Sequence, residues 1–114
     1  MVAVVRGDIV LCDFNPVMGS EQAGIRPALV IQIDRANAAS PRTIVAPFTS
    51  KIRNVLLPSH VFVGAGVAGL SLDSVLLCEQ IRAIDKQRII KSLGHLDDNS
   101  MLQVAIALKN ILGL

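Results

Sequence analysis

Short apolar runs bounded by Gly, Pro, Asn, Asp and Ser follow one another along most of this sequence. Runs of this kind predict β-strands, and turn residues at short spacing predict an antiparallel sheet or a small barrel. We expect a helical turn at 85–88 and strands over 8–14, 28–33, 43–48, 60–63, 74–84 and 91–96. The chain is therefore predicted to be mainly β.

The C-terminal segment has a different periodicity. Residues 97–100, Asp-Asp-Asn-Ser, offer helix N-cap candidates and negative charge at a helix start, and Gly113 stands where a C-cap glycine belongs. Between them, apolar residues recur on one helical face at Met101, Val104, Ala105, Leu108, Ile111 and Leu112. Leu102 and Ile106 form a second apolar stripe, which lies either at the edge of the core or against a second subunit. The predicted class is thus β+α.

Composition limits the chain to one domain, residues 1–114, with an aliphatic core. Of its 114 residues 52% are hydrophobic, yet it has three Phe and no Tyr or Trp. It is too apolar for a disordered tail and lacks the rings that base-stacking nucleic-acid modules need. Its net charge of +2 permits nucleic-acid binding without arguing for it. So much aliphatic surface on a small body is expected to leave an exposed patch, and we expect a homodimer.

Cysteine use and hydropathy indicate a cytoplasmic protein. Cys12 and Cys78 stand in apolar runs without a CxxC pair or a neighbouring His, so we expect two buried, reduced thiols. The apolar start of the chain is too short for a signal peptide. Residues 54–72 carry no Asp, Glu, Lys or Arg, but their Pro and Gly residues favour a strand with turns over a membrane span.

The connection at 15–26 carries the most chemistry. It holds a hydroxyl, a carboxylate, an amide and a guanidinium, from Ser20, Glu21, Gln22 and Arg26. Long loops on a rigid sheet often carry binding residues, although a solvated hairpin loop has a similar composition. From the residues alone, both interpretations stay open.

Several blocks of the sequence resemble the MazF/PemK family of toxin endoribonucleases, and look closest to its Gram-positive branch. The longest block is 19–30, Gly-Ser-Glu-Gln-Ala-Gly-Ile-Arg-Pro-Ala-Leu-Val. Further blocks are Arg-Gly-Asp-Ile-Val at 6–10, Asp-Phe-Asn-Pro at 13–16, Val-Ala-Pro-Phe-Thr-Ser at 45–50, Asp-Ser-Val at 73–75 and Glu-Gln-Ile-Arg-Ala-Ile-Asp-Lys at 79–86.

The resemblance implies a small SH3-like antiparallel β-barrel with a C-terminal α-helix, assembled as a homodimer. It implies cleavage of single-stranded RNA, mostly mRNA, without a metal or cofactor, leaving a 2′,3′-cyclic phosphate and a 5′-hydroxyl. A cognate MazE-like antitoxin is the implied protein partner. The family's catalytic Arg falls on Arg26, and its catalytic Thr falls on Thr49.

The chemistry of RNA cleavage fits these two residue types. RNA carries its own nucleophile, the 2′-hydroxyl, so a metal-activated water is not needed, and the sequence shows no ligand cluster of His, Asp and Glu. Arg26 is expected to stabilise the charge on the phosphorane, because a guanidinium is planar, charged and bidentate toward phosphate. The Thr49 hydroxyl is expected to bond an oxygen of the scissile phosphate. The general base and general acid stay unassigned.

Further RNA contacts are expected from Ser20, Glu21, Gln22, Ser50, Glu79, Gln80 and Arg82. For Glu21, a base contact and a role in holding Arg26 are both open. Glu79 either lines the groove or is an ordinary exposed strand residue, and Arg82 either binds phosphate or is solvated. Structural roles are expected for Phe14, Phe48, His60 and His95.

Two other function classes fit the sequence less well. A non-enzymatic toxin of the same fold that poisons DNA gyrase uses a Trp near the end of its C-terminal helix, and this chain has no Trp. An inactive scaffold that binds only its antitoxin is disfavoured because both Arg26 and Thr49 are present.

Overall fold

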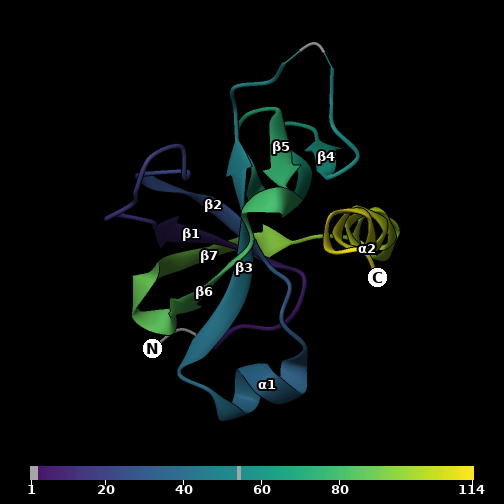
Figure 1. Ribbon diagram of the computed structural model, residues 1–114. Coiled ribbons are helices and arrows are strands. Elements are labelled where there is room, and N and C mark those ends of the chain that lie inside the picture. The colour runs from purple at the N-terminus through teal and green to yellow at the C-terminus, as the bar shows by residue number, and fades with distance from the viewer. Residues whose placement is uncertain (1–2, 54) are drawn as a thin grey trace.

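A computed structural model describes residues 3–53 and 55–114 of the chain, so Met1, Val2 and Asn54 lie outside the account that follows. The described residues form a curved antiparallel sheet with a helix at the C-terminus (Figure 1). The strands are β1 (Asp8–Asp13), β2 (Ile25–Val30), β3 (Arg42–Thr49), β4 (His60–Val63), β5 (Ser74–Leu77), β6 (Arg82–Asp85) and β7 (Ile89–His95). The helices are α1 (Asp34–Ala39) and α2 (Asp98–Leu112), with 3-10 turns η1 (Val67–Gly69), η2 (Cys78–Gln80) and η3 (Lys86–Arg88). The predicted β+α class is confirmed.

The sheet is open rather than closed into a barrel. Its strands follow the order β4-β5-β3-β2-β1-β7, and β6 pairs with β3 beside that path. One edge of β3 pairs with β2, while its other edge is shared between β6 at Arg42–Val45 and β5 at Phe48–Thr49. Within the described residues the path therefore ends at β4 and β7, so the small SH3-like barrel that the resemblance implies is an open, curved sheet in this structure.

The predicted strand over 74–84 is broken in the middle. The turn η2 at Cys78–Gln80 separates β5 from β6, so that Leu76 pairs with Phe48 and Ala83 with Ile44. The run contains neither Gly nor Pro, so nothing local signals the break. Its consequence is that Glu79 and Gln80 lie on a turn at the edge of the sheet, rather than within a strand.

The core lies on both faces of the sheet. Ile9 and Val10 are consecutive residues of β1 that point to opposite faces, and both are fully buried. Phe14 and Phe48 are each 1% exposed, which confirms that these rings are structural. Both cysteines are buried free thiols, as expected. Burial raises the pKa of Cys12 to about 12, and burial with the nearby Glu79 charge raises that of Cys78 to about 11.

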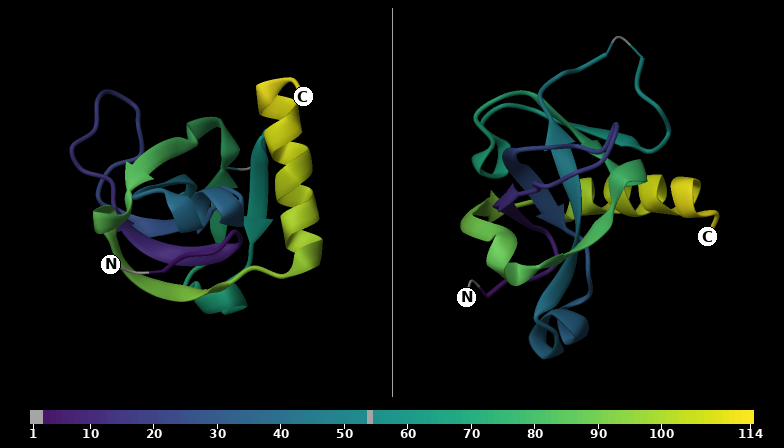
Figure 2. Two further views of the ribbon diagram at one scale, coloured as in Figure 1. Left: turned by 90° about the horizontal axis from the view of Figure 1, so that it is seen from below. Right: turned by 60° about the vertical axis from the view of Figure 1, so that its left-hand side comes forward.

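The C-terminal helix has the predicted caps. Asp97 Oδ2 accepts a hydrogen bond from the Ser100 backbone N–H at 3.0 Å, and Gly113 ends the helix at φ 72°. Figure 2 shows α2 running beside β4, on the side of the molecule opposite the β1–β2 loop. Leu102 and Ile106 are 64% and 61% exposed, so this second stripe lies outside the core. In the part of the chain that the structure describes, neither helix is long and apolar enough to cross a membrane.

The short helix α1 was not expected from the sequence. It is fixed at its C-terminal side by Asn37, which is 3% exposed. Asn37 Oδ1 accepts hydrogen bonds from the Thr43 hydroxyl at 2.7 Å and from Gln32 Nε2 at 2.9 Å. These side-chain hydrogen bonds join α1 to the start of β3, and no periodicity in the sequence predicts them.

Asn37→Ala is expected to lower the free energy of unfolding by about 1–3 kcal/mol, because the buried Thr43 hydroxyl loses its acceptor. Urea unfolding would measure the loss. Asn99→Ala, at an exposed position of α2, is the control and should change stability little. Equal effects of the two substitutions would contradict the assignment.

Candidate active site

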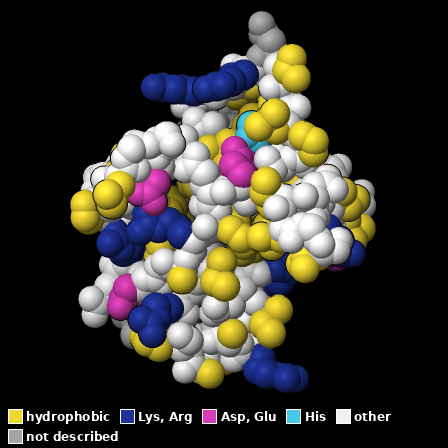
Figure 3. Space-filling model, viewed as in Figure 1, with side chains coloured by type: hydrophobic (Ala, Val, Ile, Leu, Met, Phe, Trp, Pro, Cys, Tyr) yellow, Lys and Arg dark blue, Asp and Glu magenta, His cyan; other side chains and the backbone are white. Residues whose placement is uncertain are grey.

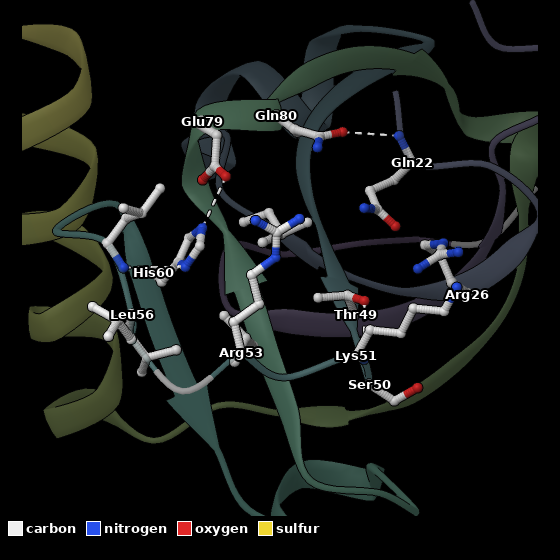
Figure 4. A pocket seen from close by; sticks show the side chains of 14 residues that line it. Gln22, Arg26, Thr49, Ser50, Lys51, Arg53, Leu56, His60, Glu79 and Gln80 are labelled. Carbon is white, nitrogen blue, oxygen red and sulfur yellow. Dashed lines mark hydrogen bonds and ion pairs between the residues drawn. The ribbon is translucent and has the colours of Figure 1, made fainter. Parts of the chain in front are cut away.

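Arg26 and Thr49 line one pocket of about 440 Å³ at the end of the sheet (Figure 4). Arg26 lies at the start of β2 and Thr49 at the end of β3. The antiparallel register that pairs Ala28 with Pro47 brings these two residues level with each other. The sequence prediction placed Arg26 in the preceding loop, whereas the structure places it on the more rigid strand.

The guanidinium of Arg26 is fixed by two backbone carbonyls. Its Nε donates to the Ala23 carbonyl oxygen at 2.8 Å, and its Nη1 donates to the Phe48 carbonyl oxygen at 3.1 Å. Partial burial lowers the pKa of Arg26 from its usual value, and the group stays a cation at neutral pH. Of the five N–H groups of a guanidinium, those not used by the backbone are available to an anion in the pocket.

The Thr49 hydroxyl is oriented by the backbone that follows it. Thr49 Oγ1 accepts a hydrogen bond from the Lys51 N–H at 3.2 Å. This bond uses a lone pair of the oxygen and leaves the hydroxyl proton, which can be donated to a second oxygen in the pocket. Arg26 and Thr49 therefore offer hydrogen-bond donors from neighbouring strands to the same space.

The loop between β1 and β2 is tied to η2. The backbone N–H of Gln22 donates to Gln80 Oε1 at 2.8 Å, as the dashed line in Figure 4 shows. Glu21 Oε1 accepts from the Met18 N–H, so this carboxylate closes a turn within its own loop. Arg26 is held by carbonyls instead, and the option that Glu21 holds Arg26 is therefore not what the structure shows.

Glu79 lines the same pocket on the side opposite Arg26 (Figure 4). Its Oε1 accepts from the Ser59 hydroxyl at 3.0 Å, and its Oε2 lies 2.9 Å from His60 Nε2. His60 Nδ1 accepts from the Leu57 N–H at 3.3 Å, so the neutral ring carries its proton on Nε2 and donates it to Glu79. Glu79 is thus a hydrogen-bonded residue on a turn, and the alternative that it is an ordinary strand residue is not what the structure shows.

His60 is a pocket residue that the sequence analysis treated as structural only. It lines the pocket and bonds Glu79, which is 19 positions away in the chain. The pairing of His60 with Leu77 across β4 and β5 brings the two side chains together. No motif around His60 signals this role, because the contact depends on a strand pairing. His95 bonds Asp8 Oδ1 at 3.0 Å and does not line this pocket.

The remaining predicted site residues occupy this pocket and the one that adjoins it. Ser50 lines the first pocket. Ser20, Glu21 and Arg82 line the adjoining pocket, which shares Gln22, Glu79 and Gln80 with the first. The Arg82 guanidinium lies 5.7 Å from the centre of the Phe14 ring, a cation–π distance. All nine predicted site residues thus lie along one continuous depression of the surface.

Two further cations stand at the mouth of the first pocket. Lys51 and Arg53 line it together with the half-exposed or exposed side chains of Val55, Leu56 and Leu57. Figure 3 shows Lys and Arg side chains beside hydrophobic ones at the top of the molecule, where the β3–β4 connection lies in Figure 1. Residues 3–53 and 55–114 contain no group of three or more His, Cys, Asp and Glu placed to hold a metal ion.

The bonds around Glu79 predict a specific acid sensitivity. Desolvation raises the pKa of Glu79, but hydrogen bonds from His60, its own backbone and Ser59 outweigh it and leave a net pKa below the usual value. Such a group stabilises the fold at pH values above the pKa that it has in the unfolded chain. This stabilisation is lost as the pH falls through the pKa that the group has in the folded protein. Below about pH 4.3, wild-type stability should therefore fall more steeply than that of Glu79→Gln.

Urea unfolding at a series of pH values would measure this difference. His60→Gln removes the main hydrogen-bond partner of Glu79. The loss of unfolding free energy in the double variant, Glu79→Gln with His60→Gln, should therefore be smaller than the sum of the losses in the two single variants. The prediction would be contradicted if the unfolding free energies of the wild type and Glu79→Gln changed with pH in parallel. It would also be contradicted if the losses in the two single variants added up to the loss in the double variant.

The fold and the site define a small β+α protein with a pocket lined by an anchored guanidinium and a hydroxyl. Over residues 5–112 the chain matches the family described as PemK-like, MazF-like toxin of type II toxin-antitoxin system. The chain therefore belongs to this family.

Individual relatives agree with the family match. The chain is 50% identical over 111 residues to Endoribonuclease EndoA of Bacillus subtilis, covering 97% of this chain and 96% of the relative. It is 46% identical over 109 residues to Endoribonuclease MazF of Staphylococcus saprophyticus, covering 96% and 91%. The crystal structure of MazF from Deinococcus radiodurans superposes with a TM-score of 0.84 at 27% identity, covering 100% of both chains.

Proposed function

We propose that this chain is an endoribonuclease toxin that cuts single-stranded mRNA at specific short sequences, without a metal ion. The observation that carries the proposal is the convergence of Arg26 and Thr49 on one pocket, with the expected contact residues around them. The names of the Bacillus and Staphylococcus relatives, both endoribonucleases, support the same reaction.

In the proposed reaction the 2′-hydroxyl oxygen of one nucleotide attacks the adjacent phosphorus, and the bond to the 5′-oxygen of the next nucleotide breaks. The 2′-hydroxyl loses its proton and the leaving 5′-oxygen gains one, so the products are a 2′,3′-cyclic phosphate and a 5′-hydroxyl. Because the nucleophile belongs to the substrate, the protein has to orient it and stabilise the charge that develops on the phosphorane.

Arg26 supplies that charge stabilisation in our proposal. Its anchors on the Ala23 and Phe48 carbonyl oxygens fix the guanidinium before substrate arrives, so little reorganisation is needed during the reaction. Thr49 donates its hydroxyl proton to another phosphate oxygen, while its Oγ1 keeps the bond that it accepts from the Lys51 N–H.

The wider depression provides the RNA-binding groove of this proposal. Its hydroxyls, amides and carboxylates suit the edges of unstacked bases, and Arg82 suits phosphate or a base plane. The proposed contact residues are Ser20, Glu21, Gln22, Ser50, Glu79, Gln80 and Arg82.

The proposed assembly is a homodimer that a cognate MazE-like antitoxin inhibits. Phe62, Leu102 and Ile106 are about half to two-thirds exposed on β4 and α2, and an apolar face of this kind is typical of a subunit contact. The family description, a toxin of a type II toxin-antitoxin system, supports the antitoxin partner. Since the proposed substrate is mRNA, we expect the protein to act in the cytoplasm. A monomeric mass in solution at micromolar concentration would refute the dimer.

The deciding experiment is cleavage of a mixed single-stranded RNA in the presence of EDTA. We expect cutting at a short recurrent sequence by the wild type and strongly reduced cutting by Thr49→Ala. Product ends should accept phosphate from a polynucleotide kinase at the 5′ side, as a 5′-hydroxyl does. Strict dependence on Mg²⁺ would refute the proposed mechanism, and undiminished cutting by both Arg26→Ala and Thr49→Ala would refute the site.

A further inference from the structure

A second, smaller pocket lies against the same two residues. It has a volume of about 230 Å³ and shares Arg26, Thr49 and Ser50 with the first pocket. Its other walls come from the start of β2, from Phe48 on β3, from the segment 70–72 and from Ser74 at the start of β5. None of the seven proposed contact residues except Ser50 lines it.

The two pockets lie on opposite faces of the sheet. Val75 lines the first pocket, whereas Ser74, its neighbour on β5, lines the second. Successive residues of a strand point to opposite faces, so the strand separates the two spaces. They meet only where both touch Arg26, Thr49 and Ser50.

The walls of the second pocket suit a flat, largely apolar ring with polar edges. Ile25 and Leu72 are 59% and 60% exposed, although both are large aliphatic residues. Ser71 and Ser74 add hydroxyls, and Ser74 Oγ donates to the Leu72 carbonyl oxygen at 2.9 Å, which fixes this turn. Apolar walls with a few placed polar groups are typical of small-molecule and base-binding sites.

The position of the pocket follows from the geometry of a phosphodiester. A phosphate held between Arg26 and Thr49 joins two nucleosides, which leave it in different directions. The first pocket continues into the groove lined by Ser20 and Arg82, and so has room for several nucleotides on one side. The second pocket, at about 230 Å³ against about 440 Å³, is only about half as large as the first and lies on the other side of Arg26 and Thr49.

We infer that this second pocket binds the base of the single nucleoside on the other side of the scissile phosphate, and that Ile25 and Leu72 determine which base is accepted. The inference rests on the proposed ribonuclease function. It adds a specificity site on the sheet face opposite the main groove, built from residues outside the expected contact set.

The test is sequencing of cleavage ends from a randomised single-stranded RNA pool cut by the wild type, Ile25→Ala and Leu72→Ala. These substitutions lie on different elements and at exposed positions, so both variants should fold, which thermal unfolding would verify. At one of the two positions flanking the cut, the preference between bases should fall about tenfold, while the other positions keep their preferences. Ile90→Ala, an aliphatic residue of β7 that is 49% exposed and lines neither pocket, is the matched control and should keep the wild-type profile.

An unchanged profile in both pocket variants would overturn the inference, as would a loss spread over positions on both sides of the cut. Either result would leave the proposed ribonuclease intact, because the wild type cuts the same pool. Absence of cutting by the wild type would overturn the proposed function, and the inference with it.

Discussion

Arg26→Ala is expected to slow RNA cleavage by about 10²–10³-fold, because it removes a preorganised stabiliser of developing negative charge. The guanidinium contributes through the N–H groups left free by the Ala23 and Phe48 carbonyl oxygens. Single-turnover cleavage of a short RNA with enzyme in excess would measure the rate of the chemical step. Arg26→Lys should recover little of it, since an ammonium lacks the planar fork that binds two phosphate oxygens.

The matched control for this prediction is Arg35→Ala. Arg35 is an exposed arginine on α1, at the other end of the central strand from the pocket. The Arg35→Ala substitution removes the same charge as Arg26→Ala and should change the cleavage rate little. If both variants lost activity equally, the effect would belong to net charge and not to the pocket.

Gly94→Ala is expected to destabilise the fold by about 3 kcal/mol or more, with loss of folded protein as the visible result. A Cβ at Gly94 would lie 2.3 Å from the Ala68 carbonyl oxygen and 2.5 Å from its carbon, and both are backbone atoms that cannot rotate away. The same contact is tight from the other side, because a Cβ at Gly69 would lie 2.1 Å from the Leu93 carbonyl oxygen. The turn η1 therefore packs directly on β7 through glycine.

Gly64→Ala is the matched control, since the nearest atoms to a Cβ there lie at 3.9 Å. Neither Gly64 nor Gly94 has a left-handed φ, so the comparison isolates steric contact from backbone strain. Chemical unfolding would compare the variants. Similar stabilities for Gly64→Ala and Gly94→Ala would show that β7 can move away from η1 at little cost.

The elements that the sequence predicted well are those whose signals are local. The caps of α2 lie within a few residues of the helix ends, and the apolar run of β1 is bounded by its own turn residues. The run 74–84 was predicted wrongly because its residues favour a strand throughout, while β3 is long enough to pair with β5 and β6 at different places. At η2, the pairing of β3 with two separate strands overrides the preference of the local sequence for one continuous strand.

For the site, the sequence alone determined the residue types. It placed a guanidinium, a hydroxyl and a set of polar contacts in three recognisable blocks, and those residues all line one depression. Only the tertiary structure decided which groups face one another. His60 reaches Glu79 through the pairing of β4 with β5, and Ile25 and Leu72 line a second pocket beside Arg26. Periodicity reports which side of its own strand a residue occupies, whereas strand register and turn packing set the neighbours that it meets across the sheet.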